Sequence, residues 1–260
     1  MPLHRWRLAA ALLPLFALVG AALPAPAVAQ TQSPNPDTVT IPGTIQSVLG
    51  CPADWQPACA NTHLNYDAAF DLWSARFELP AGDYEYKAAL NDSWGENYGA
   101  NAAPGGANIA LALAAPASVL FIYDHKTNLV ADSANTPLVV ATGDFQSELG
   151  CPADDDPACL GSLLLDPDGD GLASFATTKL PAGIYALRIA VGETLDGAIG
   201  EGDQPDGPPI SFTVAADGDE IYFGYDVNSS KITLSTQGAP KGNLAKPRAF
   251  WASADTIVWT

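Results

Sequence analysis

The sequence predicts an all-β fold, with two tandem immunoglobulin-like β-sandwiches that follow a signal peptide. The first observation is an internal repeat: the segment 50–59 recurs as 150–159, and the segment 79–84 recurs as 180–185. A period of about 100 residues is too long for a solenoid and is typical of two small domains in tandem. The two copies of the second motif are one residue further apart than the two copies of the first motif. Repeat 2 has therefore gained one residue between the two motifs.

The second observation is a β pattern in both repeats. Apolar and polar side chains alternate along residues 73–79 and again along 84–90, with a Pro/Gly turn between them. Further short apolar runs in repeat 1, and their counterparts in repeat 2, cover residues 109–113, 119–123, 173–180, 184–191, 210–214 and 220–225. No window shows a sustained helical period with caps, and only residues 65–73 are ambiguous. Many short strands joined by Gly- and Pro-rich turns indicate immunoglobulin-like sandwiches.

The repeats and the breaks between them define the expected domains. We expect a signal peptide at 1–29, a linker at 30–38, module 1 at 39–132, module 2 at 138–236, a linker at 237–246 and the start of a truncated further domain at 247–260. The last segment is strand-like and belongs to neither repeat. Since an unpaired apolar strand at a terminus is an aggregation liability, we expect the gene product to continue beyond Thr260.

Residues 1–29 have the three parts of an export signal. Arg5 and Arg7 give a cationic start, 8–23 is an apolar run, and Ala27-Val28-Ala29 is a small-x-small cleavage site. A membrane anchor is the alternative, but the run is short and Pro14 interrupts it. We therefore expect a secreted protein, extracellular or periplasmic, with no membrane association after cleavage.

The chain is strongly acidic, with a net charge of −18. Loss of Arg5 and Arg7 with the signal would make the remainder two charges more negative. Such a chain repels nucleic acid and anionic membranes and is compatible with neutral ligands such as sugars.

All four cysteines lie in the two repeated motifs, and seven residues separate the members of each pair. For an exported chain we expect two local disulfides, Cys51–Cys59 and Cys151–Cys159. The alternative is a single four-thiolate metal site, which would need both loops to meet, and this spacing is not that of a zinc finger.

The sequence predicts no catalytic residues in this chain. After the signal it has only two histidines, His63 and His125, and it has no nucleophile elbow, phosphate-binding loop or dinucleotide fingerprint. Carboxylates are plentiful, but a sandwich of this size offers little depth for a glycosidase pair. We expect no cofactor other than the calcium considered below, and we expect these residues not to form an enzyme by themselves.

The segment 91–99 (Asn-Asp-Ser-Trp-Gly-Glu-Asn-Tyr-Gly) is the richest candidate binding stretch. It follows a predicted strand and combines aromatic rings, on which sugar C–H faces stack, with amides and carboxylates that bind hydroxyls. Repeat 2 has no aromatic residue or asparagine at the matching place, 191–200. Either this loop binds a sugar, or Trp94 and Tyr98 plug the end of the core. The candidate ligand residues here are Asn91, Asp92, Trp94, Glu96, Asn97 and Tyr98.

Three further residues are candidates for the same site. Trp55 lies inside the first cysteine loop, where repeat 2 has Asp155. Lys87 points away from Tyr84 and Tyr86 and is either a hydroxyl donor or a solvated strand residue, and His125 has no counterpart in repeat 2.

The segment 166–171 has the Asp-x-Asp-x-Asp-Gly spacing that opens a calcium loop. Asp166, Asp168 and Asp170 would be the ligands. Position 12 of such a loop would be Thr177 rather than Glu, and strand residues follow, so an Asp/Gly turn is the alternative to calcium binding.

Four segments together resemble the X25 modules that stand before the catalytic domain of secreted bacterial pullulanases and amylopullulanases. They are Cys51–Cys59, Leu79–Lys87, Asn91–Gly99 and Tyr123–Thr127, and the resemblance covers residues 40–236. Repeat 2 resembles the second module of such a pair but departs from the pattern at the Trp/Asn loop. The final segment, 249–260, is similar to the strand that opens the next pullulanase domain.

The resemblance implies an accessory role in the degradation of starch, glycogen or pullulan, with a glycosidase domain as partner in the same gene product. Our leading hypothesis is that repeat 1 binds α-glucan. The second is that both modules are spacers or docking surfaces without sugar affinity, and the third is calcium-dependent adhesion through repeat 2.

Overall fold

The computed structural model describes residues 35–240 and the backbone of the strand 248–250. In this part of the chain every regular element is a β-strand or a short 3₁₀ turn. No helix among these residues has the length and apolar character needed to cross a membrane. The predicted signal peptide, and most of the segments 237–246 and 247–260, fall outside the described residues.

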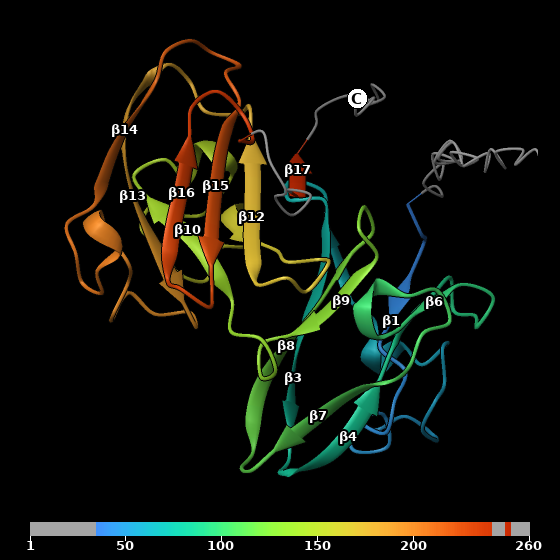
Figure 1. Cartoon of the computed structure of the whole chain (residues 1–260). Helices are drawn as coiled ribbons and strands as arrows, with labels where there is room; N and C mark the ends of the chain where they lie inside the picture. The colour runs from blue at the N-terminus through green and yellow to red at the C-terminus, as the bar shows by residue number, and fades with distance from the viewer. Residues whose placement is uncertain (1–34, 241–247, 251–260) are drawn as a thin grey trace, which may run out of the picture. The chain divides into compact units, whose positions relative to one another are not determined.

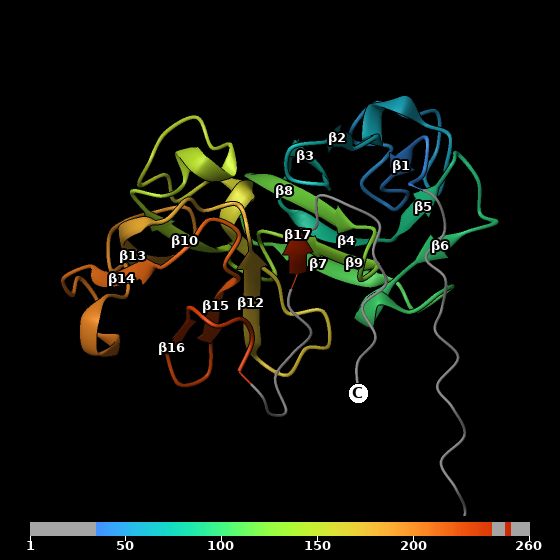
Figure 2. The same cartoon turned by 90° about the horizontal axis from the view of Figure 1, so that it is seen from above.

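Module 1 (residues 39–132) is built from nine strands in two layers (Figure 1). One layer contains the four-stranded sheet β2-β3-β8-β9, and the other contains the sheets β1-β5-β6 and β4-β7. Figure 2 shows β1, β5 and β6 side by side. The strands are β1 (Val39–Thr40), β2 (Asn65–Asp67), β3 (Leu72–Leu79), β4 (Gly82–Tyr86), β5 (Ala88–Leu90), β6 (Asn97–Tyr98), β7 (Ile109–Leu113), β8 (Ala117–Asp124) and β9 (Leu129–Asp132).

Module 2 (residues 138–236) repeats this plan with the sheets β11-β10-β13-β14 and β16-β15-β12-β17. Within the module all pairs are antiparallel, whereas β17 is parallel to β12. The strands are β10 (Val139–Gly143), β11 (Leu163–Leu164), β12 (Leu172–Thr177), β13 (Gly183–Val191), β14 (Ile210–Val214), β15 (Ile221–Asp226), β16 (Lys231–Ser235) and β17 (Arg248–Phe250). The prediction of an all-β fold with two sandwiches is confirmed.

Each module buries its own apolar core between its two layers, because alternate residues of each strand point inward. In β4 the buried residues Tyr84 and Tyr86 alternate with the exposed Asp83 and Glu85. The core of module 1 joins such tyrosines to Trp73 and Phe121, and the core of module 2 is centred on stacked phenylalanines. Trp73 is therefore a core residue, as its alternation predicted.

The stretch predicted as one strand at 84–90 is divided at Lys87. The part before it, β4, pairs with β7, and the part after it, β5, pairs with β1 and β6. The backbone N–H of Lys87 donates to the carbonyl of Pro42 instead of to a ladder partner. This break places Lys87 where the chain passes from one small sheet to the next.

Strand register locates the residue that repeat 2 has gained. Ala75 faces Phe121 and Phe77 faces Val119 in module 1, exactly as Phe175 faces Phe223 and Thr177 faces Ile221 in module 2. The extra residue therefore lies between Thr177 and Leu180, where β12 has already ended. An insertion outside the paired residues leaves the alternation of the core unchanged.

The last described strand, β17, adds to the edge of module 2. Its three residues lie beside Phe175–Thr177 of β12. The sequence suggested that this segment belongs to neither repeat, but the structure uses its backbone to cover an edge that would otherwise expose unpaired N–H and C=O groups.

A third apolar cluster joins residues of both modules. Leu72, Leu120 and Ile122 lie on the face of β3 and β8 that points away from the core of module 1, yet they are buried. They pack with Leu138, Val140, Leu163 and Leu165. Alternation of apolar and polar residues predicts a strand that is buried on one face only. At Leu72 and Trp73 both faces of β3 are buried, one by the core of module 1 and the other by residues of module 2.

The two cysteine loops are closed by the expected disulfides, Cys51–Cys59 and Cys151–Cys159. Each loop is also held by a buried glutamine. Gln46 donates to the carbonyl of Gln56 and to Thr62 Oγ1, both at 2.8 Å, and accepts from the N–H of Gln56. Gln146 makes the same three bonds in module 2. The loops therefore follow one path in both modules.

We predict that Tyr86 makes the protein sensitive to alkaline pH. Its hydroxyl is fully buried and donates to Asp132 Oδ2 at 2.6 Å, and burial, followed by the charge of Asp132, raises its pKa above the usual value of about 10. A tyrosine whose pKa is higher in the folded state contributes stability that is complete below about pH 10 and is lost above it.

The test is urea unfolding of Tyr86→Phe and the wild type at pH 7 and pH 11. At pH 7 the variant should lose about 1–3 kcal/mol, because Asp132 loses a partner. Between pH 7 and pH 11 it should lose less stability than the wild type, and an equal loss would contradict the assignment.

Candidate functional site

Trp55 stands at the tip of the first disulfide loop. Its backbone is left-handed, with φ of 58°, and its N–H points toward the carbonyl of Gly43. The corresponding residue of module 2, Asp155, has the same conformation, with φ of 51°. Aspartate tolerates this region, whereas for a bulky residue it costs about 1–2 kcal/mol. The loop therefore imposes the conformation on Trp55, and the conformation does not favour an indole.

Trp94 lies in the loop that joins β5 to β6, and 41% of its surface is exposed. Two left-handed residues, Asn91 and Asp92, begin this loop, and a bond from the N–H of Leu90 to the carbonyl of Glu96 closes it. The indole is therefore carried by a short loop whose two ends are both fixed by the backbone.

The two tryptophans form one aromatic surface. Their ring centroids are 6.4 Å apart and their planes are inclined by 38°. Together with Lys87 and Asn108 they line an open hollow of about 300 Å³. The structure therefore brings together three residues that the sequence suggested, Trp55, Lys87 and Trp94, although they come from three different segments.

Asn108 is a residue of this hollow that the sequence reasoning missed. It precedes β7, and its side-chain amide donates to Glu85 Oε2 at 2.9 Å. The hollow therefore has an ammonium group and an amide beside its two rings, and the amide is held by the carboxylate of Glu85. The signal available in the sequence was its counterpart in repeat 2, Pro209, which cannot hydrogen-bond in this way.

Asn91 and Asp92 hold the start of the loop rather than facing the hollow. Asn91 Oδ1 accepts from the N–H of Asp37, and Asp92 Oδ1 accepts from Thr38 Oγ1, both at 2.8 Å. His63 Nε2 lies 3.0 Å from Asp92 Oδ1, in poor alignment for a hydrogen bond. The bonds of Asn91 and Asp92 therefore connect the loop to Asp37 and Thr38, just before β1.

Of the remaining candidates from the sequence, Glu96, Asn97 and Tyr98 lie at the end of the loop, and His125 follows β8. Asn97 donates to the carbonyl of Trp94 at 3.0 Å, and the Tyr98 hydroxyl donates to Glu96 Oε1 at 2.8 Å. Burial, and then the bond to Glu96, raise the pKa of Tyr98 to about 12. His125 is 93% buried, with Nδ1 3.0 Å from the hydroxyl of Tyr123. None of these four is among the residues that line the described hollow.

Module 2 begins the matching loop in the same conformation but has a different surface at this place. Shared left-handed residues align Asn91 with Gly192 and Asp92 with Glu193, which aligns Trp94 with Leu195. The four residues of the hollow, with Glu85, become Asp155, Arg188, Leu195, Pro209 and Ala186. Module 2 therefore keeps a cation but has neither ring.

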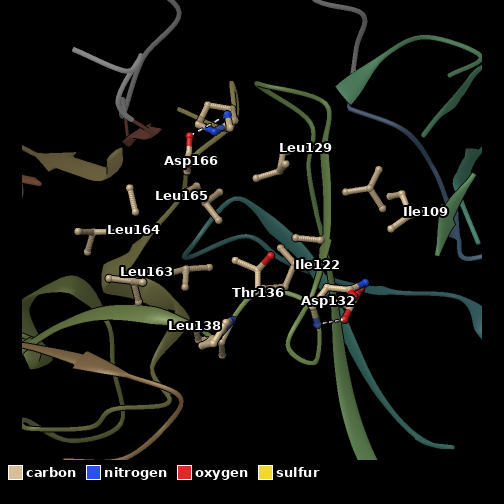
Figure 3. Close-up of a pocket in the computed structure, with 18 of the residues that line it drawn as sticks. Ile109, Ile122, Leu129, Asp132, Thr136, Leu138, Leu163, Leu164, Leu165 and Asp166 are labelled. Atoms are coloured by element: carbon tan, nitrogen blue, oxygen red, sulfur yellow. Dashed lines mark hydrogen bonds between the residues drawn. The ribbon is translucent and has the colours of Figure 1, made fainter. Parts of the chain in front are cut away.

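A second cavity, of about 340 Å³, has a different character. Figure 3 shows Leu163, Leu164 and Leu138 opposite Ile109, Ile122 and Leu129. Its carboxylates are already engaged: Asp132 accepts from Tyr86 and Asn135, and Asp166 accepts from Gly169 and Gly171. We assign no ligand to this apolar space.

The predicted calcium residues do lie together. Asp166, Asp168 and Asp170 each offer a carboxylate oxygen within 4.8 Å of the others. Backbone amides occupy part of this set, since Asp166 accepts from Gly169 and Gly171, and burial raises the pKa of Asp166. Thr177, which would be position 12, is buried in β12. The donor set suits a divalent cation, and calcium binding stays a prediction.

If the three aspartates bind calcium, excess calcium should raise the melting temperature of the protein. The gain should disappear in Asp168→Ala, because one of the three converging carboxylates is lost. Differential scanning calorimetry with calcium and with a chelator makes this comparison. An equal melting temperature in both would reject the site.

We also predict that Trp55→Asp leaves the protein at least as stable as the wild type. The change removes the backbone strain of a bulky residue in the left-handed region and introduces the residue that module 2 has there. It also removes the ring contact with Trp94. Chemical denaturation should give an unfolding free energy unchanged or higher by up to about 1 kcal/mol. A loss above ~1 kcal/mol would mean that the indole supports the fold.

Comparison with known proteins agrees with this architecture. The family described as pullulanase X25 domain matches residues 38–130 and 138–232. Among curated proteins, an amylopullulanase of Thermoanaerobacterium saccharolyticum is 44% identical over 87 residues, which are 33% of this chain and 7% of that protein. An amylopullulanase of Thermoanaerobacter thermohydrosulfuricus is 31% identical over 204 residues, which are 76% of this chain and 13% of that protein.

A pullulanase from Bacillus acidopullulyticus is a solved structure with similarity to 77% of this chain, at 18% identity, over 28% of its own length. The TM-score of 0.35 is too low to support a comparison of details. The chain spans only 7–13% of the length of the two curated relatives. Since the family matches both modules over nearly their whole length, the chain belongs to the pullulanase X25 domain family.

Proposed function

We propose that module 1 binds α-glucan through the hollow between Trp55 and Trp94, and that the chain is a non-catalytic accessory region of a secreted pullulanase-type glycoside hydrolase. The observation that carries the proposal is the pair of inclined indole rings beside Lys87, Asn108 and Glu85. Aromatic faces beside polar hydrogen-bonding groups are what a pyranose ring requires, since one of its faces is apolar and its rim carries hydroxyls.

The chemistry of the hollow favours a neutral, hydroxylated ligand. Lys87 is a hydroxyl donor, and the Asn108–Glu85 pair offers both donors and acceptors. An anionic polymer would meet the negative field of a chain with net charge −18. The two adjacent rings form an apolar surface, and contiguous apolar surface beside polar groups is typical of a binding site.

The inclination of the rings favours a curved polymer. A β-1,4-glucan is a flat ribbon and matches coplanar rings, whereas an α-1,4-glucan coils and presents successive sugars at an angle. Rings inclined by 38° suit the second. The names of the matched relatives, both amylopullulanases, point to the same class of substrate.

The strain at Trp55 supports a functional role for that ring. A left-handed backbone disfavours an indole, and module 2 folds the same loop with an aspartate. An unfavourable residue that the fold does not need suggests a role in binding.

The accessory role rests on the relatives. Each is many times longer than the part it shares with this chain, so we propose that a glycosidase domain of the same gene product is the partner of these modules. Module 2 would then be a spacer or docking surface, since it lacks both rings. Export is consistent with the two disulfides.

The test is retention of the chain on insoluble starch, with cellulose as the control polymer. We expect the wild type to be retained on starch, and Trp94→Ala and Trp55→Ala each to weaken binding by about tenfold or more, because each removes an apolar ring from the contact. Leu195→Ala, the matched change in module 2, should bind like the wild type.

No retention of the wild type would reject the proposal and favour the alternative, in which both modules only position a neighbouring domain. Equal retention on starch and cellulose would reject the argument from ring inclination. Melting temperatures of all variants, measured in parallel, separate lost binding from lost folding.

A further inference from the structure

The loop that carries Trp94 begins and ends in the same way in both modules. Asn91 and Asp92 have φ of 54° and 55°, and their counterparts Gly192 and Glu193 have 79° and 62°. At the other end, Tyr98 forms a β-bridge with Pro104, and its counterpart Ile199 forms the same bridge with Pro205. The start and the end of the loop are therefore properties of the shared fold.

In module 1 two side chains brace this loop from its second half. The amide of Asn97 donates to the carbonyl of Trp94 at 3.0 Å. Tyr98 is 92% buried, its ring stacks on Tyr123 with centroids 5.9 Å apart, and its hydroxyl donates to Glu96 at 2.8 Å. The backbone of Trp94 is thus bonded to Asn97, and the next residue, Tyr98, is anchored on the buried ring of Tyr123.

Module 2 has none of these braces. Ala198 and Ile199 replace Asn97 and Tyr98, and Gly197 replaces Glu96. A backbone bond, from the N–H of Ala198 to the carbonyl of Leu195, takes the place of the asparagine bond. With Gly197 in the left-handed region at φ of 75°, the second half of this loop joins the same two ends without side-chain braces, so the shared fold alone does not require them. They occur in the module that has Trp94 and are missing from the module that has leucine there.

We propose that Asn97 and Tyr98 are positioning residues, which hold the Trp94 indole in its binding orientation before the ligand arrives. The inference rests on the proposed function for its effect on affinity, but the ordering of Trp94 is a property of the free protein. Holding a side chain in place beforehand saves the entropy of immobilising it on binding, which is about 0.5–1.5 kcal/mol for one side chain.

The test substitutes the residues that module 2 already uses, Asn97→Ala and Tyr98→Ile, in the whole chain. The matched controls make the reverse changes in module 2, Ala198→Asn and Ile199→Tyr. Tyr98→Phe keeps the stacked ring and removes only the hydroxyl.

Two quantities are measured. The first is the ¹⁹F NMR signal of Trp94 in ligand-free protein labelled with 5-fluorotryptophan, assigned by its absence in Trp94→Phe. The second is the affinity for a soluble maltooligosaccharide by titration calorimetry.

We expect one sharp Trp94 signal in the wild type, and a broadened or divided signal in Asn97→Ala and Tyr98→Ile. Affinity should fall about three- to tenfold in both variants. Tyr98→Phe should recover most of the sharpness, and the module 2 variants should match the wild type in both measurements.

An unchanged Trp94 signal overturns the proposal. If affinity still falls, Asn97 and Tyr98 contact the sugar directly, and if it does not, they serve neither role. Should the wild type bind no glucan while its Trp94 signal responds to the substitutions, the positioning role stands and the proposed function fails.

Discussion

A buried glutamine fixes the backbone conformation of each disulfide loop. The candidate site depends on the glutamine of module 1, because Trp55 lies in that loop. Gln46 satisfies both main-chain groups of Gln56, the residue after Trp55, from a position with no exposed surface. An unpaired amide buried there would cost ~1–3 kcal/mol, so the glutamine and the loop must fold together. Because Gln146 makes the same bonds, this arrangement belongs to the fold, and the indole at the tip is an addition to it.

The duplication separates what the fold needs from what a site needs. Both modules keep the disulfide, the glutamine, the left-handed loop residues and the two-layer core. They differ in the aromatic rings, in Asn108 and in the braces of the Trp94 loop. Two copies in one chain therefore provide an internal comparison for assigning roles to residues.

Much of the fold could be predicted from the sequence, because strand alternation and the repeat are local signals. The apolar runs at 109–113 and 210–214 coincide with β7 and β14, and the cysteine spacing predicted both disulfides. The break at Lys87 was not foreseen, since alternation continues across it while the pairing partner changes. The burial of Leu72 and Ile122 on the outer face was missed because it depends on contact with module 2.

The candidate site was only half accessible to sequence reasoning. Aromatic composition drew attention to Trp55 and Trp94, but their proximity depends on how two loops from distant segments converge. Asn108 carries no signal by itself, in a stretch of alanine and glycine. Tyr98 and His125 follow strands and so looked like loop residues, yet each is more than nine-tenths buried.

The left-handed conformation of Trp55 connects this geometry to evolution by duplication. Under the proposed function, module 1 keeps an indole in an unfavourable conformation because the indole binds the ligand, which is the usual trade-off between stability and function. A second copy released from that activity is free to accept aspartate, a residue that its loop prefers. Module 2 would then be the more relaxed partner of the pair, able to tolerate further substitutions and to acquire a different surface while module 1 retains its own.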